Sequence, residues 1–168
     1  SPEEPAYLND NAARLSPEVL ALLQLPAIPY NLDAWDGYAY EREVIYATAK
    51  SLKHNLVVIA GDTHNAWANE LTDSNGDTVG VEFATSSVSS PGLEYYLGLS
   101  DAEMPATEAA IVGLINDLKY ANLKDRGYLL LTFTADEVRG DWQYVDTILD
   151  TNFASLDARN YSATSAAG

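Results

Sequence analysis

The chain has 168 residues, of which 47% are hydrophobic, so it can bury a core of its own and is not a largely disordered protein. Its 25 acidic and 9 basic residues give a formal net charge of −16, which argues against a nucleic-acid binding surface and against binding to anionic membranes. No cysteine is present, which excludes disulfides, thiolate zinc sites and a cysteine nucleophile, and no apolar run is long enough for a membrane span. The same negative charge would repel a phosphorylated ligand unless bound cations reversed the local field.

The first part of the chain predicts two helices and a buried strand. Ser16 and Pro17 suit the N-cap and first position of a short helix that ends before Pro26. Apolar residues at helical spacing predict a second helix over 38–53. Residues 56–60 are Leu-Val-Val-Ile-Ala, a continuous apolar run typical of a strand that is covered on both faces.

The middle of the chain predicts a hairpin, a loop and a helix. Residues 68–71 and 79–84 predict two strands joined around Asn75-Gly76, and this hairpin turn is favoured over a calcium-binding loop for the acidic stretch 73–77. Residues 85–92 predict a serine-rich loop. Ser100-Asp-Ala-Glu103 is a capping-box pattern, and the helix after it is expected to turn a stripe inward, formed by Thr107, Ile111, Leu114, Ile115 and Leu118.

The last part predicts two long strands, over 128–134 and 138–147. In the second, Val138, Trp142 and Tyr144 alternate with polar residues, so we expect them on the buried face. Residues 1–150 are expected to belong to one domain, and the small and polar residues of 151–168 predict a loose tail.

The strongest candidate for chemistry is the segment that follows the buried strand, Gly61-Asp-Thr-His64. A strand that ends there presents Asp62 and His64 at its carboxyl edge, where open α/β sheets bind ligands, and Gly61 would allow the turn. A carboxylate with an imidazole suits iron, zinc or manganese. The alternative is that Asp62 caps the next segment and that His64 is an ordinary, partly buried histidine.

Four stretches, in order, resemble the alkaline phosphatase D (PhoD-like) family of metallophosphoesterases. They are Trp35-Asp-Gly-Tyr38 with Arg42, the segment Gly61 to Leu71, the strand and serine-rich loop from Val81 to Pro91, and Asp125-Arg-Gly-Tyr128 with Val138-Arg-Gly-Asp-Trp142. The resemblance implies an α/β sandwich of two mixed sheets flanked by helices, of which this chain forms the C-terminal half.

The resemblance also implies a metal-dependent phosphatase, acting on phosphate monoesters and with diesters as a second class. Its metals would be iron and calcium, with zinc or manganese as alternatives. Asp62 and His64 match the family's late metal ligands and take the catalytic role, Asp62 as an anionic ligand and His64 as a neutral imidazole.

Other residues are assigned to the substrate. Trp35, Tyr38 and Arg42 are expected to shape the pocket, and Arg42 either binds phosphate or pairs with a neighbouring glutamate. Asn65 either bonds substrate or water, or serves the turn. His54 is assigned no chemistry.

The family's further ligands come from its first half, and nothing before Trp35 resembles those segments. The chain alone would also leave Val57 and Ile59 facing solvent. We therefore expect it to fold with a missing N-terminal segment, and family analogy implies an extracytoplasmic location. The rival hypothesis is a secreted, acidic, non-catalytic binding module with a degenerate phosphatase fold.

Overall fold

A computed structural model describes residues 33–166, and the helix expected after Ser16 lies outside them. The chain divides into two units, Ser1–Ile45 and Tyr46–Gly168, each described by itself. The described part of the first unit holds the 3-10 helix η2 (Trp35–Tyr38) and the start of α3 (Ala39–Leu52). Within 33–166, every helix is too short or too polar to cross a membrane.

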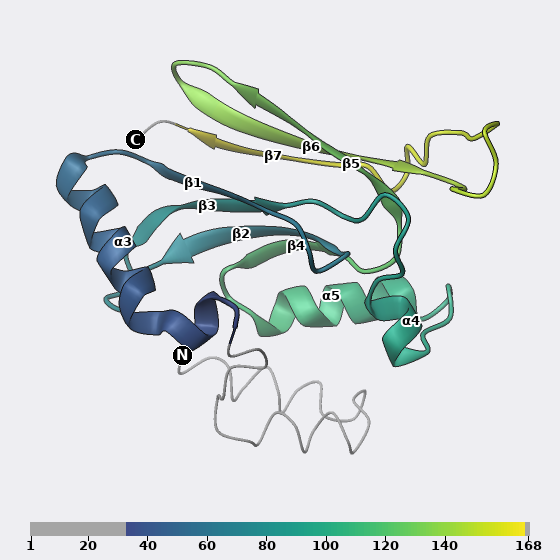
Figure 1. Cartoon of the computed structure of the whole chain (residues 1–168), viewed down its shortest axis with the longest axis horizontal. Coiled ribbons are helices and arrows are strands. Elements are labelled where there is room, and N and C mark those ends of the chain that lie inside the picture. Colours follow the sequence, from purple (N-terminus) through teal and green to yellow (C-terminus); the bar gives the residue numbers. More distant parts are fainter. Residues whose placement is uncertain (1–32, 167–168) are drawn as a thin grey trace. The chain divides into compact units, whose positions relative to one another are not determined.

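The second unit contains a mixed four-stranded sheet (Figure 1). Its strands are β1 (Leu56–Ala60), β2 (Ala66–Thr72), β3 (Thr78–Ala84) and β4 (Leu118–Asn122), in the order β1-β3-β2-β4. β1 runs parallel to β3, and the other pairs are antiparallel. The β2–β3 hairpin is confirmed, and its turn uses the positive φ of 85° that Gly76 adopts without steric cost.

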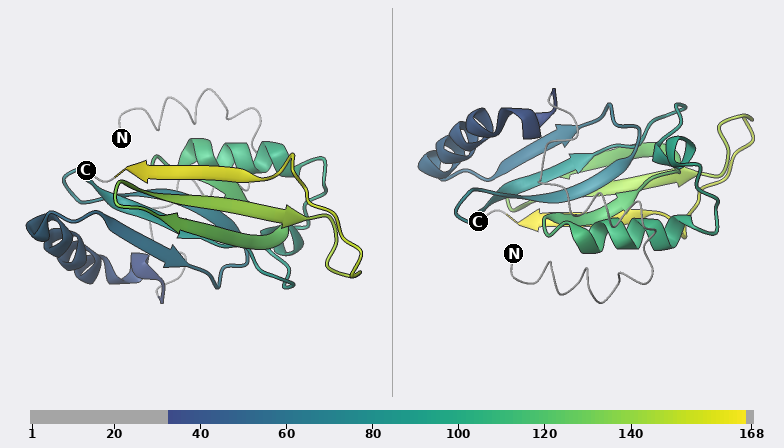
Figure 2. Two further views of the ribbon diagram at one scale, coloured as in Figure 1. Left: turned by 90° about the horizontal axis from the view of Figure 1, so that it is seen from above. Right: turned by 90° about the horizontal axis from the view of Figure 1, so that it is seen from below.

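A second sheet is antiparallel and covers one face of the first (Figures 1 and 2). It consists of β5 (Arg126–Phe133), β6 (Glu137–Val145) and β7 (Tyr161–Ala166), in that order. Among the described strands, therefore, only the first sheet is mixed, not both as expected. The stretch 151–168, expected to be a loose tail, contains β7, which pairs with β6 from Tyr161 to Ala166.

Helices cover the opposite face of the mixed sheet. The short helix α4 (Leu93–Leu97) was not foreseen, and α5 (Met104–Leu114) packs Met104 against Leu118, Ala121 and Leu123. The expected helical stripe ran on to Leu118, but the helix ends at Leu114 and Leu118 begins β4. The apolar residues keep their helical spacing on both sides of the turn that Asn116 and Asp117 form, so spacing alone could not show where the helix ends and the strand begins.

The main core lies between the two sheets. Trp142 is 0% exposed, meets Phe83 edge-on at 5.5 Å between ring centroids, and donates its Nε1–H to the Ala84 carbonyl at 2.9 Å. The expected inward face of β6 is confirmed, since Val138, Trp142 and Tyr144 are all buried. Val57 was expected to face solvent, but it packs against this core because the second sheet covers it. Ile59, on the same edge strand, is 59% exposed as expected.

Candidate metal centre

Asp62 and His64 lie in the five-residue connection between β1 and β2. Since β1 and β3 are parallel and end in register, Ala60 opposite Ala84, the segments that follow them emerge at the same edge. The Thr85 amide donates to the Ala60 carbonyl at 3.0 Å and holds the two strand ends together. The sheet thus places this connection beside the serine-rich segment 85–92.

The backbone of this connection is strained at both candidate ligands. Asp62 has a φ of 69° and His64 a φ of 64°, a region that residues with a side chain rarely adopt. The Thr63 amide donates to the Gly61 carbonyl at 2.8 Å, which closes a tight three-residue turn on Asp62. The turn therefore falls on Asp62 and not on Gly61, where an added Cβ would meet only Thr85 Cγ2 at 3.8 Å. Such conformations cost about 1–3 kcal/mol each and cluster at functional sites.

The His64 ring is fixed in one orientation and one tautomer. Its Nδ1 lies 2.9 Å from the Pro91 carbonyl oxygen. Because a carbonyl can only accept, Nδ1 carries a proton, and in the neutral ring Nε2 is then the nitrogen with the free lone pair. A histidine that binds a metal ion is commonly held in this way by a carbonyl on its other nitrogen. Asp62 is exposed and leaves its carboxylate accessible.

Hydrogen bonds of Asn65 and Trp67 brace the strained connection. Asn65 is 3% exposed; its Nδ2 donates to the Thr63 carbonyl at 2.7 Å, and its Oδ1 accepts from the Leu93 amide at 2.9 Å. Trp67 Nε1 donates to Thr63 Oγ1 at 3.0 Å. Both ends of the Asn65 amide are thus used within the protein, which favours the turn role over the substrate role. A direct contact of Asn65 with substrate stays a prediction.

A second braced segment, 122–126, was missed by sequence reasoning. Arg159 donates to Asp125 Oδ2 at 2.6 Å and to both carboxylate oxygens of Glu108 at 2.8 and 2.9 Å. Asn122 Nδ2 donates to the same Asp125 oxygen at 2.8 Å. Partial burial alone would lower the pKa of Arg159, but the bonds to Asp125 and Glu108 outweigh it and raise the pKa. The one local signal was Glu108, a charge between apolar residues of its helix.

Asp62 and His64 alone would make only a partial ligand set. Across residues 33–166, no three side chains of His, Asp or Glu lie close enough together to hold an ion. Two ligands from one strand edge leave most of a metal's coordination positions to other groups.

Comparison with known proteins shows the family of the chain. The family model described as PhoD-like phosphatase matches residues 6–142. The chain belongs to the PhoD-like phosphatase family. It is 28% identical over 130 residues to alkaline phosphatase D of Bacillus subtilis (strain 168), a match that covers 74% of this chain and 21% of that protein. The chain therefore spans about a fifth of the length of this PhoD-like relative, and no solved structure matches it.

One of the four PhoD-like stretches, Trp35–Tyr38 with Arg42, lies in the first unit. Trp35 and Tyr38 are exposed, and the Tyr38 hydroxyl donates to Asp33 Oδ1 at 3.3 Å. Arg42 Nη1 donates to Asp36 Oδ1 at 3.0 Å, so its partner is an aspartate of the same block and not a neighbouring glutamate. Arg42 Nε is buried without a partner. The roles of Trp35, Tyr38 and Arg42 toward substrate stay predictions.

Proposed function

We propose that this chain supplies Asp62 and His64 as metal ligands to a site that hydrolyses phosphate monoesters, with diesters as a second substrate class. The observation that carries the proposal is the His64 ring, held through Nδ1 by the Pro91 carbonyl so that Nε2 is available to a metal. Membership of the PhoD-like phosphatase family supports the choice of reaction. In it, the oxygen of water bonds to phosphorus, the ester P–O bond breaks, and the proton of water ends on the alcohol.

The two side chains fit hard and borderline cations. The exposed Asp62 carboxylate suits calcium or iron, and a neutral imidazole at His64 suits iron, zinc or manganese. Iron with calcium is the combination proposed here, by family resemblance. Bound cations would neutralise phosphate charge and activate water. Such neutralisation is needed in a chain with a formal charge of −16.

The remaining ligands are proposed to come from other parts of a PhoD-like polypeptide. The support is that no three His, Asp or Glu side chains among the described residues lie together to hold an ion, while the matched part of this chain corresponds to 21% of the relative's length. The activity is thus proposed for the enzyme that contains this chain, and its location is proposed to be extracytoplasmic by analogy.

The test is turnover of p-nitrophenyl phosphate by that enzyme, with and without a chelator. We expect the chelator, Asp62→Asn and His64→Ala each to lower kcat by at least about a hundredfold, since each removes charge stabilisation from the site. The matched control is His54→Ala, because His54 is the other of the chain's two histidines and is exposed. Turnover that survives both the chelator and Asp62→Asn would remove the metal mechanism. A complete lack of turnover and of bound metal in the wild type would favour the non-catalytic module.

A further inference from the structure

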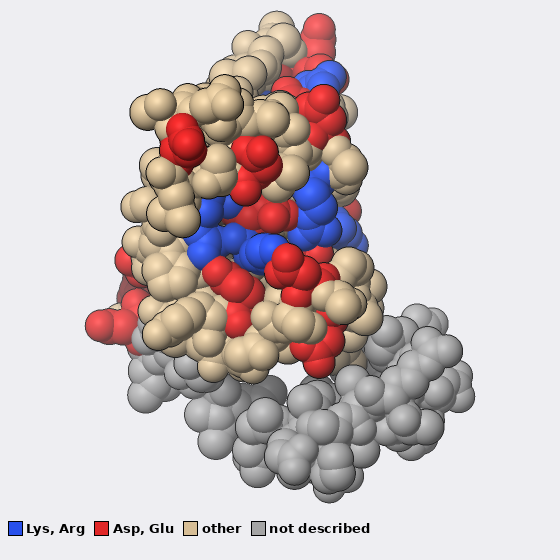
Figure 3. Space-filling model, turned by 90° about the vertical axis from the view of Figure 1, so that its right-hand side faces the viewer, with Lys and Arg blue, Asp and Glu red and all other residues tan. Residues whose placement is uncertain are grey.

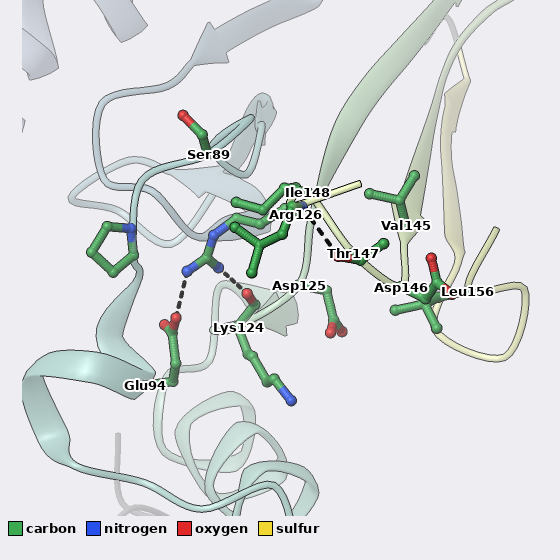
Figure 4. Close-up of a pocket in the computed structure, with 12 residues that line it drawn as sticks. Ser89, Glu94, Lys124, Asp125, Arg126, Val145, Asp146, Thr147, Ile148 and Leu156 are labelled. Carbon is green, nitrogen blue, oxygen red and sulfur yellow. Dashed lines mark hydrogen bonds and ion pairs between the residues drawn. The ribbon is translucent and has the colours of Figure 1, made fainter. Parts of the chain in front are cut away.

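A hollow of about 480 Å³ opens in the second unit, and Figure 4 shows the side chains that line it. It lies between the segment after β3, the β4–β5 connection and the segment after β6, and it is lined among others by Pro91, Arg126 and Thr147. Pro91 connects the two sites, because its carbonyl accepts from His64 and its side chain lines the hollow. The volume is in the range of pockets that hold small organic molecules.

One wall of the hollow is apolar. It is formed by Val145, Ile148, Leu149 and Leu156. Leu149 is 93% exposed and Ile148 is 42% exposed, so this wall presents apolar surface to whatever enters the hollow. Apolar side chains gathered at the wall of a pocket, with a few polar groups opposite, are typical of a site for an organic ligand.

The lining also carries charged side chains of both signs, Lys124 and Arg126 with Glu94, Asp125 and Asp146. On this side of the molecule, Lys and Arg side chains gather between acidic ones (Figure 3). Arg126 is committed to structure, because it donates to Glu94 and to the Lys124 carbonyl (Figure 4). The Lys124 ammonium is paired instead with Asp101, whose side chain is 85% exposed. Exposed pairs of this kind contribute about 0–1 kcal/mol, so the ammonium can exchange its partner for a ligand anion.

Glu94 also lines the hollow, but it is committed to structure. Its Oε1 accepts from Arg126 and its Oε2 is buried, so its carboxylate offers no acceptor to a ligand there.

We propose that this hollow is a subsite for the alcohol part of the phosphate ester. It takes an apolar or aromatic group against Ile148 and Leu149, and Lys124 attracts the negative charge that the ester carries. Pro91 borders the hollow and its carbonyl holds His64 Nδ1, and the proposal places the phosphate of an ester at the metal centre and its alcohol part past Pro91, in the hollow. The substrate class is therefore esters of apolar or aromatic alcohols, and this proposal rests on the phosphatase function proposed above.

The experiment measures binding and does not depend on turnover. The full chain is titrated with 1-naphthyl phosphate, with 1-naphthol and with inorganic phosphate, and dissociation constants are taken from amide chemical shifts. We expect Leu149→Ser to weaken binding of both naphthyl compounds by about 5- to 30-fold, since it removes the apolar contact. Lys124→Ala is expected to weaken 1-naphthyl phosphate by about 3- to 10-fold and to leave 1-naphthol unchanged.

Two controls separate the subsite from general effects. Leu97→Ser removes an apolar side chain that is 56% exposed but does not line the hollow, so binding should not change. Asp62→Asn is expected to lower hydrolysis by the enzyme that contains this chain by at least about a hundredfold and to leave binding of 1-naphthol to the chain intact, so that failure of the phosphatase function and failure of the subsite give different results. Equal affinity of wild type and Leu149→Ser for the naphthyl compounds would overturn the subsite. So would shifts that appear with inorganic phosphate alone.

Discussion

Replacement of Asn65 by alanine tests whether the strained connection is held by buried hydrogen bonds. The change removes the donor to the Thr63 carbonyl and the acceptor for the Leu93 amide, at a position that is 3% exposed. Thr63 is exposed, so its carbonyl can turn to water and the loss there is about 1 kcal/mol. The Leu93 amide is partly buried and would lose about 1–3 kcal/mol of stabilisation. The sum is about 2–4 kcal/mol.

The assay is thermal unfolding followed by calorimetry or circular dichroism. For a chain of this size, about 2–4 kcal/mol lowers Tm by roughly 5–15 °C. Asn69→Ala is the matched control, because Asn69 makes a single long bond, 3.4 Å to Glu82 Oε2, and should cost under about 1 kcal/mol. If Asn65→Ala unfolds at the wild-type temperature, the bracing is wrong. If Asn65→Ala leaves the stability unchanged and raises KM, the substrate role of Asn65 is the better explanation.

Two further predictions concern stability. Hydrogen bonds from Lys50 and from the Asp77 amide lower the pKa of Asp73 to about 2, below its ordinary value of 3.8. The contribution of the ionised Asp73 carboxylate to stability is complete above pH of about 4 and is lost as the pH falls toward about 2. The Tm of wild type should therefore exceed that of Asp73→Asn above this window, and the difference should disappear across it. A difference that stays constant with pH would refute the pairing. Trp142→Phe should lower the free energy of unfolding in denaturant by about 2–4 kcal/mol, since it leaves a gap and an unpaired Ala84 carbonyl. The control Trp35→Phe, on the surface, should change it by under about 0.5 kcal/mol. Equal effects of the two substitutions would contradict this account of the core.

Local signals in the sequence predicted the elements around the metal centre. The strand Leu56–Ala60 has the bounds expected from its apolar run, and the Asn75-Gly76 turn joins β2 and β3 as expected. These succeed because the information lies within a few consecutive residues. The inward face of β6 follows from alternation in the same way.

Contacts between distant residues could not be predicted. Arg159 meets Glu108 across 51 positions, and no local pattern indicates that pairing. β7 contains serine, threonine and alanine, whose composition suggests a tail, and only pairing with β6 makes it a strand. The positive φ of Asp62 and His64 likewise comes from surrounding hydrogen bonds, so the sequence identified the candidate ligands but not the geometry that presents them.

The central claim is that His64 offers Nε2 to a metal while Nδ1 donates to Pro91. The most direct measurement is a long-range ¹⁵N–¹H correlation spectrum of the chain's two histidine rings, recorded before and after addition of Zn²⁺. We predict that His64 is in the Nδ1–H form and that its Nε2 resonance shifts with the metal in wild type, less so in Asp62→Asn, while His54 stays unchanged. An Nε2–H form of His64, or equal shifts of both rings, would contradict the claim.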